Sequence, residues 1–219
     1  MALFAGSLLG ANAQDATADH LTALVKPGTQ KQLTIQLKNG IDYTAFQMKI
    51  SLPDGMTFAG DPALSNRSDS HQIHFSKSTD NKTMTVAVFS YEETGGTKKG
   101  NLAFKENKGP VLLVNVTIDP EVLGAFKNES CDVSGITVAD VEFVQNSDLK
   151  GKALALTSVG KLGDTNGDKK INGTDASKVV DHILGNVLLS DEEFERSSFT
   201  GGDNVSGPDY SNIVDIILN

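Results

Sequence analysis

Asp164-Thr-Asn-Gly-Asp-Lys-Lys-Ile-Asn-Gly-Thr-Asp175 is the stretch in which oxygen-bearing side chains recur at the spacing of a metal-binding loop. In a calcium loop of the EF-hand type, side chains at positions 1, 3 and 5, a backbone carbonyl at 7, position 9 and a carboxylate at 12 surround the ion. The corresponding residues are Asp164, Asn166, Asp168, Lys170 through its carbonyl, Asn172 and Asp175. Lys169 replaces the usual glycine at position 6, and the last acid is Asp rather than Glu. We predict that this loop holds calcium.

A helix cap is the alternative explanation of the same residues. An Asx-rich turn that only caps a helix needs one such side chain, whereas four stand in this loop. A helical pattern does follow over 175–184, with apolar residues at three- and four-residue spacing and Gly185 placed to end the helix. The unit is therefore predicted to be a loop followed by one helix.

The loop and helix recur at the end of the chain. Ile171-Asn-Gly-Thr-Asp175 is echoed by Val205-Ser-Gly-Pro-Asp209. The matched helix residues are Ser177, Val180, Asp181, Ile183 and Leu184 in the first copy and Ser211, Val214, Asp215, Ile217 and Leu218 in the second. Because both the turn residues and the apolar register are kept, we interpret the pair as an internal duplication.

The second loop lacks most of the predicted ligands. Ser198, Thr200 and Gly202 stand where the first copy has its three oxygen side chains, and Asp203 falls one place out of register. We expect this loop to hold calcium weakly or to be held by packing alone. A single structural calcium, which fixes the start of the helix at 175–184, is then the prediction for the whole module.

A duplicated calcium loop and helix of this length resembles a type I dockerin, the small module by which secreted proteins bind a cohesin partner. The resemblance covers 163–219 and rests on the Asp-x-Asn-x-Asp-x-x-Ile-x-x-x-Asp pattern together with the repeat. It implies calcium as the cofactor and a cohesin-like protein partner. Carried over by position, the partner-binding residues are Gly173 and Thr174 in the first copy and Gly207 and Pro208 in the second.

The preceding part of the chain has a different pattern, with short β-branched runs broken by turn residues such as Asn39-Gly40. The runs predict strands at 20–25, 32–38, 45–52, 72–77, 84–89, 111–118, 136–143 and 153–157. Only 121–126 indicates a brief helical turn. This spacing is typical of an antiparallel β-sandwich. The predicted fold class is therefore mostly β with a small all-α C-terminal module.

In detail this part resembles cohesins and related immunoglobulin-like modules of secreted bacterial glycan-degrading systems. The residues that carry the resemblance are Lys26-Pro-Gly-Thr-Gln30 before a strand, and the run from Ala45 to Pro53-Asp-Gly-Met56. We expect a signal-peptide remnant at 1–14, a cohesin-like β-sandwich at 15–160 and a dockerin-like calcium-binding domain at 161–219. The few residues between the two domains favour side-by-side packing over a flexible tether.

Composition limits the environment and the partners. The net charge of −9 disfavours binding to nucleic-acid phosphate. The apolar start with Ala11-Asn12-Ala13 is typical of a secretion signal, although its basic segment is missing, and no later run is long enough to span a membrane. We therefore predict export, to the periplasm, the cell surface or the medium. Cys131 is the only cysteine, so no internal disulfide can form.

No catalytic pattern stands out, because the chain has no Gly-x-Ser-x-Gly elbow, no His-Glu-x-x-His and no phosphate-binding glycine loop. Ser190 before Asp191-Glu-Glu193 indicates a helix N-cap rather than a pair of catalytic acids. We predict a non-catalytic assembly protein, in the setting of polysaccharide degradation. One alternative is a carbohydrate-binding module; its candidate aromatic residues are Tyr43, Phe46, Tyr91 and Phe104. The other is a closed structural unit of a cell-surface assembly.

Overall fold

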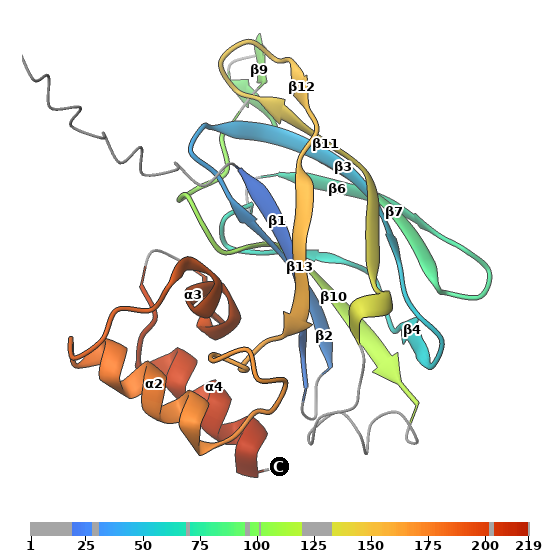
Figure 1. Cartoon of the computed structure of the whole chain (residues 1–219). Helices are drawn as coiled ribbons and strands as arrows, with labels where there is room; N and C mark the ends of the chain where they lie inside the picture. The colour runs from blue at the N-terminus through green and yellow to red at the C-terminus, as the bar shows by residue number, and fades with distance from the viewer. Residues whose placement is uncertain are drawn as a thin grey trace, which may run out of the picture.

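The computed structural model describes residues 19–27, 31–68, 71–94, 97–100, 102–119, 133–201 and 204–218. Two β-sheets face each other, and three helices gather beside one of them (Figure 1). The prediction of a mostly β chain with a small helical C-terminal module is confirmed. The expected signal remnant at 1–14, the helical turn at 121–126 and Cys131 fall outside the described residues.

The first sheet has the strand order β13-β1-β2-β10-β4, with β5 paired to β10. Its strands are β1 (His20–Lys26), β2 (Gln32–Lys38), β4 (Met56–Phe58), β5 (Ala63–Leu64), β10 (Pro110–Ile118) and β13 (Ala155–Lys161). β1 and β13 run parallel, with His20 opposite Ala155 and Val25 opposite Lys161. This one parallel pair departs from the antiparallel pairing expected for the sandwich. β1 and β13 lie at opposite ends of the sandwich sequence, so no hairpin has to connect them.

The second sheet has the order β12-β11-β3-β7-β6. Its strands are β3 (Tyr43–Ser51), β6 (Gln72–Lys77), β7 (Thr83–Phe89), β11 (Thr137–Gln145) and β12 (Gly151–Lys152). A separate hairpin pairs β8 (Tyr91–Thr94) with β9 (Thr97–Gly100), and a short 3-10 helix, η1 (Val133–Gly135), precedes β11. Each predicted strand is present within a few residues of its expected place. The strands that were not predicted have only two to four residues, too few for an alternating pattern to be recognised.

The core of the sandwich lies between the two sheets. Inward-facing side chains alternate along β3, which is buried at every second position towards its end, as expected for a sheet with one solvated face. Four aromatic rings pack together inside: Phe143 lies 5.2 Å from Tyr43 and 5.1 Å from Phe46, and Phe46 lies 5.7 Å from Phe104, between ring centroids. These contacts join β3, β11 and the segment that follows β9.

β1 and β2 are buried on both faces, in contrast to β3. Leu21, Ala23 and Val25 face the sandwich core, whereas Thr22 and Leu24 point to the other side and are nevertheless buried. The C-terminal helices cover this outer face (Figure 1). β1 therefore contributes one face to the sandwich core, and its other face is buried on the side where the C-terminal helices lie.

The C-terminal module consists of α2 (Gly173–Ile183), α3 (Asp191–Ser197) and α4 (Gly207–Leu218). Its own core contains the repeat-related pairs Ile171 with Val205 and Val179 with Ile213, and Phe194 of α3 joins them. α2 begins two residues earlier than the expected 175, because Asn172 rather than a later residue is its N-cap. Among the described residues, no helix is long and apolar enough to cross a membrane.

Candidate functional site

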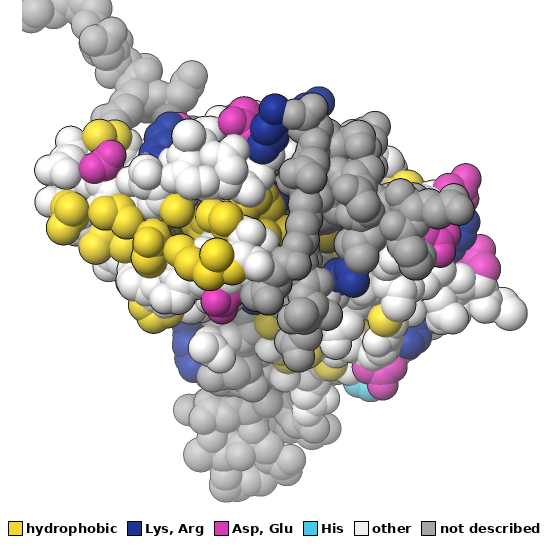
Figure 2. All heavy atoms as spheres, turned by 90° about the horizontal axis from the view of Figure 1, so that it is seen from below, with side chains coloured by type: hydrophobic (Ala, Val, Ile, Leu, Met, Phe, Trp, Pro, Cys, Tyr) yellow, Lys and Arg dark blue, Asp and Glu magenta, His cyan; other side chains and the backbone are white. Residues whose placement is uncertain are grey.

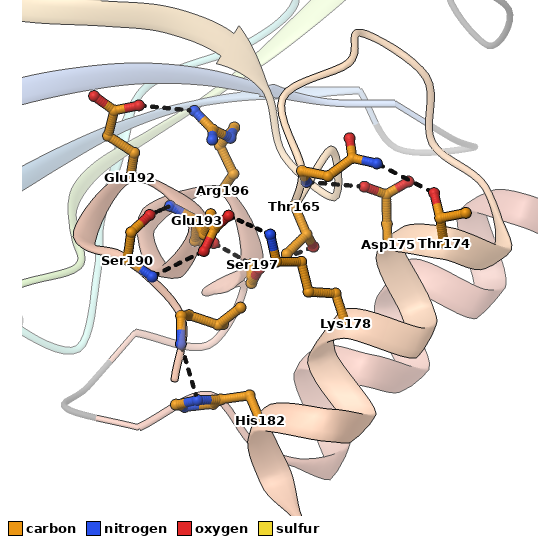
Figure 3. A network of polar contacts seen from close by, with 12 residues as sticks. Thr165, Thr174, Asp175, Lys178, His182, Ser190, Glu192, Glu193, Arg196 and Ser197 are labelled. Atoms are coloured by element: carbon orange, nitrogen blue, oxygen red, sulfur yellow. Dashed lines mark hydrogen bonds and ion pairs between the residues drawn. The ribbon is translucent and has the colours of Figure 1, made fainter. Parts of the chain in front are cut away.

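The first loop closes on itself through its own acidic side chains. Asp164 Oδ2 accepts the N–H of Lys169 at 2.9 Å, and Asp168 Oδ1 accepts the N–H of Lys170 at 2.8 Å. Asp175, which is fully buried, accepts the N–H of Asn166 at 3.1 Å with Oδ1 and that of Asn172 at 2.9 Å with Oδ2. The carboxylate at position 12 therefore joins both halves of the loop (Figure 3).

The capping alternative is confirmed for two of these residues. Asn172 caps α2 by accepting the N–H of Thr174 at 2.8 Å, and Asp175 completes the capping box through the N–H of Asn172. Such a box satisfies two of the backbone donors that every helix leaves unpaired at its start. Asp164, Asn166 and Asp168 have no part in this box, so capping accounts for only two of the five oxygen side chains.

Burial disfavours the charged form of two of the loop carboxylates, those of Asp164 and Asp175. The pKa of Asp164 is raised, chiefly by burial and further by the charge on Asp168, despite lowering by the Lys169 N–H and by Arg196. The pKa of Asp175 is raised by burial as well, with the charges on Asp164 and Asp168 acting in the same direction. Asp164 Oδ1 is buried and accepts no hydrogen bond from any residue that the structure describes. A hard cation would supply both the missing partner and the opposite charge.

The carboxylates are not preassembled into a cage. In the described part of the chain, no three His, Cys, Asp or Glu side chains gather in an arrangement that could hold a metal ion. The oxygen atoms in question are turned towards backbone N–H groups of the loop instead. The candidate ligands suit calcium, because every one of these side chains offers an oxygen atom. They would have to move closer together to surround the ion.

Lys169 occupies loop position 6 in the left-handed conformation, with φ of +72°. A glycine adopts this conformation without the steric conflict that a Cβ brings, which explains why glycine is usual here. The buried ammonium of Lys161 donates to the carbonyl of Lys169 at 2.9 Å and so helps to hold the turn. The missing glycine is thus accommodated by a side chain from the last residue of β13.

The second loop is likewise closed by hydrogen bonds to its last aspartate. Asp209 is fully buried, and its Oδ1 accepts the N–H groups of Phe199 and Thr200 at 2.8 and 2.9 Å. Its Oδ2 accepts the N–H and the hydroxyl of Ser206 at 2.9 and 3.0 Å. Asp175 and Asp209 thus accept N–H groups from equivalent positions. In each copy, one donor lies nine residues and another three residues before the aspartate. The duplication seen in the sequence is present in the backbone geometry, although Gly202 and Asp203 fall outside the described residues.

Six large apolar side chains of the C-terminal module are exposed to solvent. These residues, which we call the α2–α4 face, are Ile183, Leu184, Val187, Leu188, Ile217 and Leu218. Leu184 is 68% exposed and Leu188 84%. Figure 2 shows apolar side chains gathered in a band on the side of the molecule where Figure 1 places α2 and α4. Contiguous exposed apolar surface of this kind marks an interaction site more often than chance.

The residues that the dockerin resemblance assigned to partner binding lie at the starts of the two long helices. Gly173 and Thr174 begin α2, Gly207 and Pro208 begin α4, and all four are exposed. A Cβ added at either glycine would meet no atom within 4 Å, so both backbones are open to a partner. His182 of α2 bonds the loop after its own helix, where its Nδ1 lies 3.3 Å from both the Leu189 N and the Val187 carbonyl oxygen (Figure 3).

The contact between module and sandwich confirms the expected side-by-side packing. Glu195 of α3 is buried and accepts the hydroxyl of Thr22 at 2.5 Å, and its other oxygen lies 3.0 Å from His20 Nε2. The side-chain amide of Gln36 donates to the carbonyl of Glu195 at 2.9 Å. The Lys108 ammonium lies 3.7 Å from the ring centroid of Phe194. The sequence did not identify Thr22 and Gln36 as contact residues. Polar residues that alternate with apolar ones in a strand usually lie on its solvated face.

Three of the four aromatic residues considered for carbohydrate binding are core residues. Tyr43, Phe46 and Phe104 are each at most 4% exposed, and the prediction that they form an exposed platform is wrong. They pack against Phe143 between the sheets, Tyr43 and Phe46 from β3 and Phe104 from the segment that follows β9. The side chain of Tyr91, the fourth candidate, falls outside the described residues.

Comparison with known proteins finds no matching family model and no matching curated protein. Among solved structures, 28 chains match. A non-cellulosomal cohesin from the hyperthermophilic archaeon Archaeoglobus fulgidus is 10% identical, with a TM-score of 0.43 over 68% of this chain and 96% of the cohesin. A type II cohesin domain from the cellulosome of Acetivibrio cellulolyticus is 8% identical, with a TM-score of 0.44 over 64% and 91%.

A cohesin module of a family 33 glycoside hydrolase from Clostridium perfringens is 12% identical, with a TM-score of 0.43 over 64% of this chain and 92% of that module. Each of these TM-scores is below 0.5 and each identity is below 25%. We therefore base the function of this chain on its own side chains.

Proposed function

We propose that this chain is a non-catalytic, exported assembly protein whose C-terminal module binds calcium in its first loop and docks onto a cohesin-type protein partner. The observation that carries the docking proposal is the α2–α4 face, which is apolar and points away from the sandwich. The dockerin resemblance supports the class of partner and a setting in polysaccharide degradation. In this proposal 1–14 is a signal remnant, 15–160 the sandwich domain and 161–219 the docking domain.

The calcium ligands in this proposal are the side chains of Asp164, Asn166, Asp168, Asn172 and Asp175 and the carbonyl of Lys170. The unpartnered buried oxygen of Asp164 and the raised pKa values of Asp164 and Asp175 support the assignment. When bound, the ion supplies positive charge to carboxylates that otherwise repel one another. Its binding free energy then adds to the free energy of folding, so calcium fixes the start of α2.

Calcium is expected to raise the melting temperature of the full-length chain relative to the same protein in chelator. At a free concentration one hundred times the dissociation constant, the stabilisation is about 2.7 kcal/mol, which corresponds to several degrees for a chain of this size. Asp168→Asn should abolish most of the gain, because it removes an exposed ligand charge while the loop hydrogen bonds can persist. Melting followed by circular dichroism measures both proteins.

In chelator, the wild type and Asp168→Asn should have melting temperatures within about a degree of each other. This comparison is the control for folding. Equal melting temperatures of the wild type with calcium and with chelator would contradict the calcium assignment.

Leu184→Asp is expected to weaken binding to a cohesin module by at least about tenfold, because a fully buried leucine contributes about 1.5–3 kcal/mol. Leu184 is 68% exposed, so its replacement should leave the melting temperature unchanged. The matched control is Leu149→Asp, which changes an exposed leucine in the turn after β11 of the sandwich. The measurement is titration calorimetry of the calcium-loaded chain against a panel of purified cohesin modules.

Failure of every cohesin to bind the wild-type chain would contradict the proposed partner. Equal loss of binding in the Leu149→Asp control would show that the α2–α4 face is not the docking surface. An array of polysaccharides, tested beside the cohesins, covers the carbohydrate-binding alternative.

A further inference from the structure

Helix α3 lies beside both the sandwich and the first loop (Figures 1 and 3). It has seven residues, Asp191–Ser197, with Ser190 as N-cap and Glu193 completing a capping box, as the sequence predicted. The proposed metal ligands and the proposed docking residues are all outside it. It nevertheless contacts both the sandwich and the loop, and this double contact is its main structural feature.

On the sandwich side, α3 provides acceptors to polar side chains of β1 and β2. The buried carboxylate of Glu195 accepts the Thr22 hydroxyl and lies against His20 Nε2. Gln36 donates to the carbonyl of Glu195 at 2.9 Å and to that of Ser198 at 3.4 Å. Removing one partner from such a buried polar cluster leaves a charged or polar atom unpaired, which is costly.

On the loop side, the next two residues of α3 bond the residues beside and within the loop. The N–H of Gly163 donates to the carbonyl of Arg196 at 2.7 Å, directly before loop position 1. The hydroxyl of Ser197 lies 2.9 Å from that of Thr165 at loop position 2, and both residues are buried. The Arg196 guanidinium packs on Gly167, where an added Cβ would lie 3.1 Å from Nη2.

These contacts come from consecutive residues of one short helix. Successive side chains on a helix differ in direction by about 100°, so Glu195 points to the sandwich while Ser197 points to the loop. A helix of two turns moves as a rigid body, and a shift that improves one set of contacts changes the other. The Arg196 charge would repel a cation, but the ion pair with Glu192 at 3.6 Å offsets part of it (Figure 3).

We propose that α3 couples the two sites, so that cation binding in the first loop and packing of the module on the sandwich strengthen each other. The proposal rests on the calcium function proposed above. By linkage, a change at the sandwich contact must alter calcium affinity by the same factor that calcium alters the contact. The docking domain and the sandwich then form one calcium-dependent unit, and calcium holds the α2–α4 face in a fixed place relative to the sandwich.

The test is titration calorimetry of calcium into the full-length chain and two variants altered only on the sandwich. Thr22→Val removes the hydroxyl that donates to Glu195 and keeps the side-chain shape, and Gln36→Met removes the two amide donations. Each should raise the calcium dissociation constant about fivefold or more, the lower end of typical coupling between sites. Thr57→Val is the matched control, since it removes a threonine hydrogen bond to Thr117 on β4 and β10 and should leave the constant unchanged.

Circular dichroism in chelator identifies a variant that fails to fold; if Thr22→Val is one, Gln36→Met decides the outcome. Wild-type affinity in the folded variants, or tighter binding, overturns the coupling while leaving the calcium function intact. Absence of binding heat in the wild-type chain overturns both. Weakening in the Thr57→Val control equal to that in the variants also overturns the coupling, because the effect would then not pass through α3.

Discussion

Phe46→Ala is expected to lower the free energy of unfolding by about 3–5 kcal/mol, the range for removing a fully buried phenylalanine. Phe46 is 2% exposed, stacks on Phe143 with 5.1 Å between ring centroids and also contacts Phe104. Its removal would leave a cavity between the two sheets that the packed strands on either side cannot fill. Urea unfolding of the purified variant measures the loss directly.

The same substitution separates a core role from a carbohydrate-binding role for this residue. Phe75→Ala is the matched control, because Phe75 is 37% exposed on the edge strand β6 and should cost only about 1 kcal/mol. A Phe46→Ala protein of wild-type stability would contradict the structure, and one that lost only polysaccharide binding would revive the platform hypothesis.

Asp209→Ala is expected to cost about 3 kcal/mol, because hydrogen bonds to a charged group contribute about 1.5–3 kcal/mol each and some of the freed donors can be rehydrated. The carboxylate of Asp209 accepts three backbone N–H groups, those of Phe199, Thr200 and Ser206, and two hydroxyls. Without it the second loop loses the hydrogen bonds by which Asp209 joins its two ends in the described residues. The expected loss is the same in calcium and in chelator, since the second loop is closed by the protein itself.

Ser211→Ala is the control for Asp209→Ala. Ser211 lies on the same helix, is exposed and bonds only the carbonyl of Gly207 among the contacts described, so its loss should change stability by less than about 0.5 kcal/mol. A larger loss of stability for Asp209→Ala in calcium than in chelator would show that the second loop binds the ion through Asp209. Urea unfolding in both conditions gives the comparison.

Much of the C-terminal module could be predicted because its information is local. The loop, its repeat and the helix caps are set by side chains within about twelve residues of one another, such as Asp175 with Asn166 or Ser190 with Glu193. The start of α2 was displaced by two residues because a capping asparagine and a calcium-ligand asparagine look alike in sequence. Whether the loop holds calcium stays a prediction.

In the sandwich, the positions of the strands could be predicted from the sequence, but the pairing between strands could not be predicted as well. Alternation in β2 and β3 identifies strands and an apolar face, since side chains at every second position share a side. Alternation does not say which strand lies beside which, so the parallel pairing of β13 with β1 was missed. It also does not distinguish an inward aromatic residue from one exposed to a ligand, and Tyr43 and Phe46 were misassigned for that reason.

The sequence by itself determined the longer strands, the two loop–helix units, the Ser190 cap and the asymmetry between a loop rich in oxygen-bearing side chains and one with few. All of these depend on neighbours along the chain. Only the tertiary structure decided that Thr22 and Gln36 are buried under α3 and that Ile183 and Leu184 remain exposed. The physical reason is that burial of a polar or apolar strand or helix face depends on which distant surface covers it, and α3 is more than 150 residues away from Thr22 in the chain.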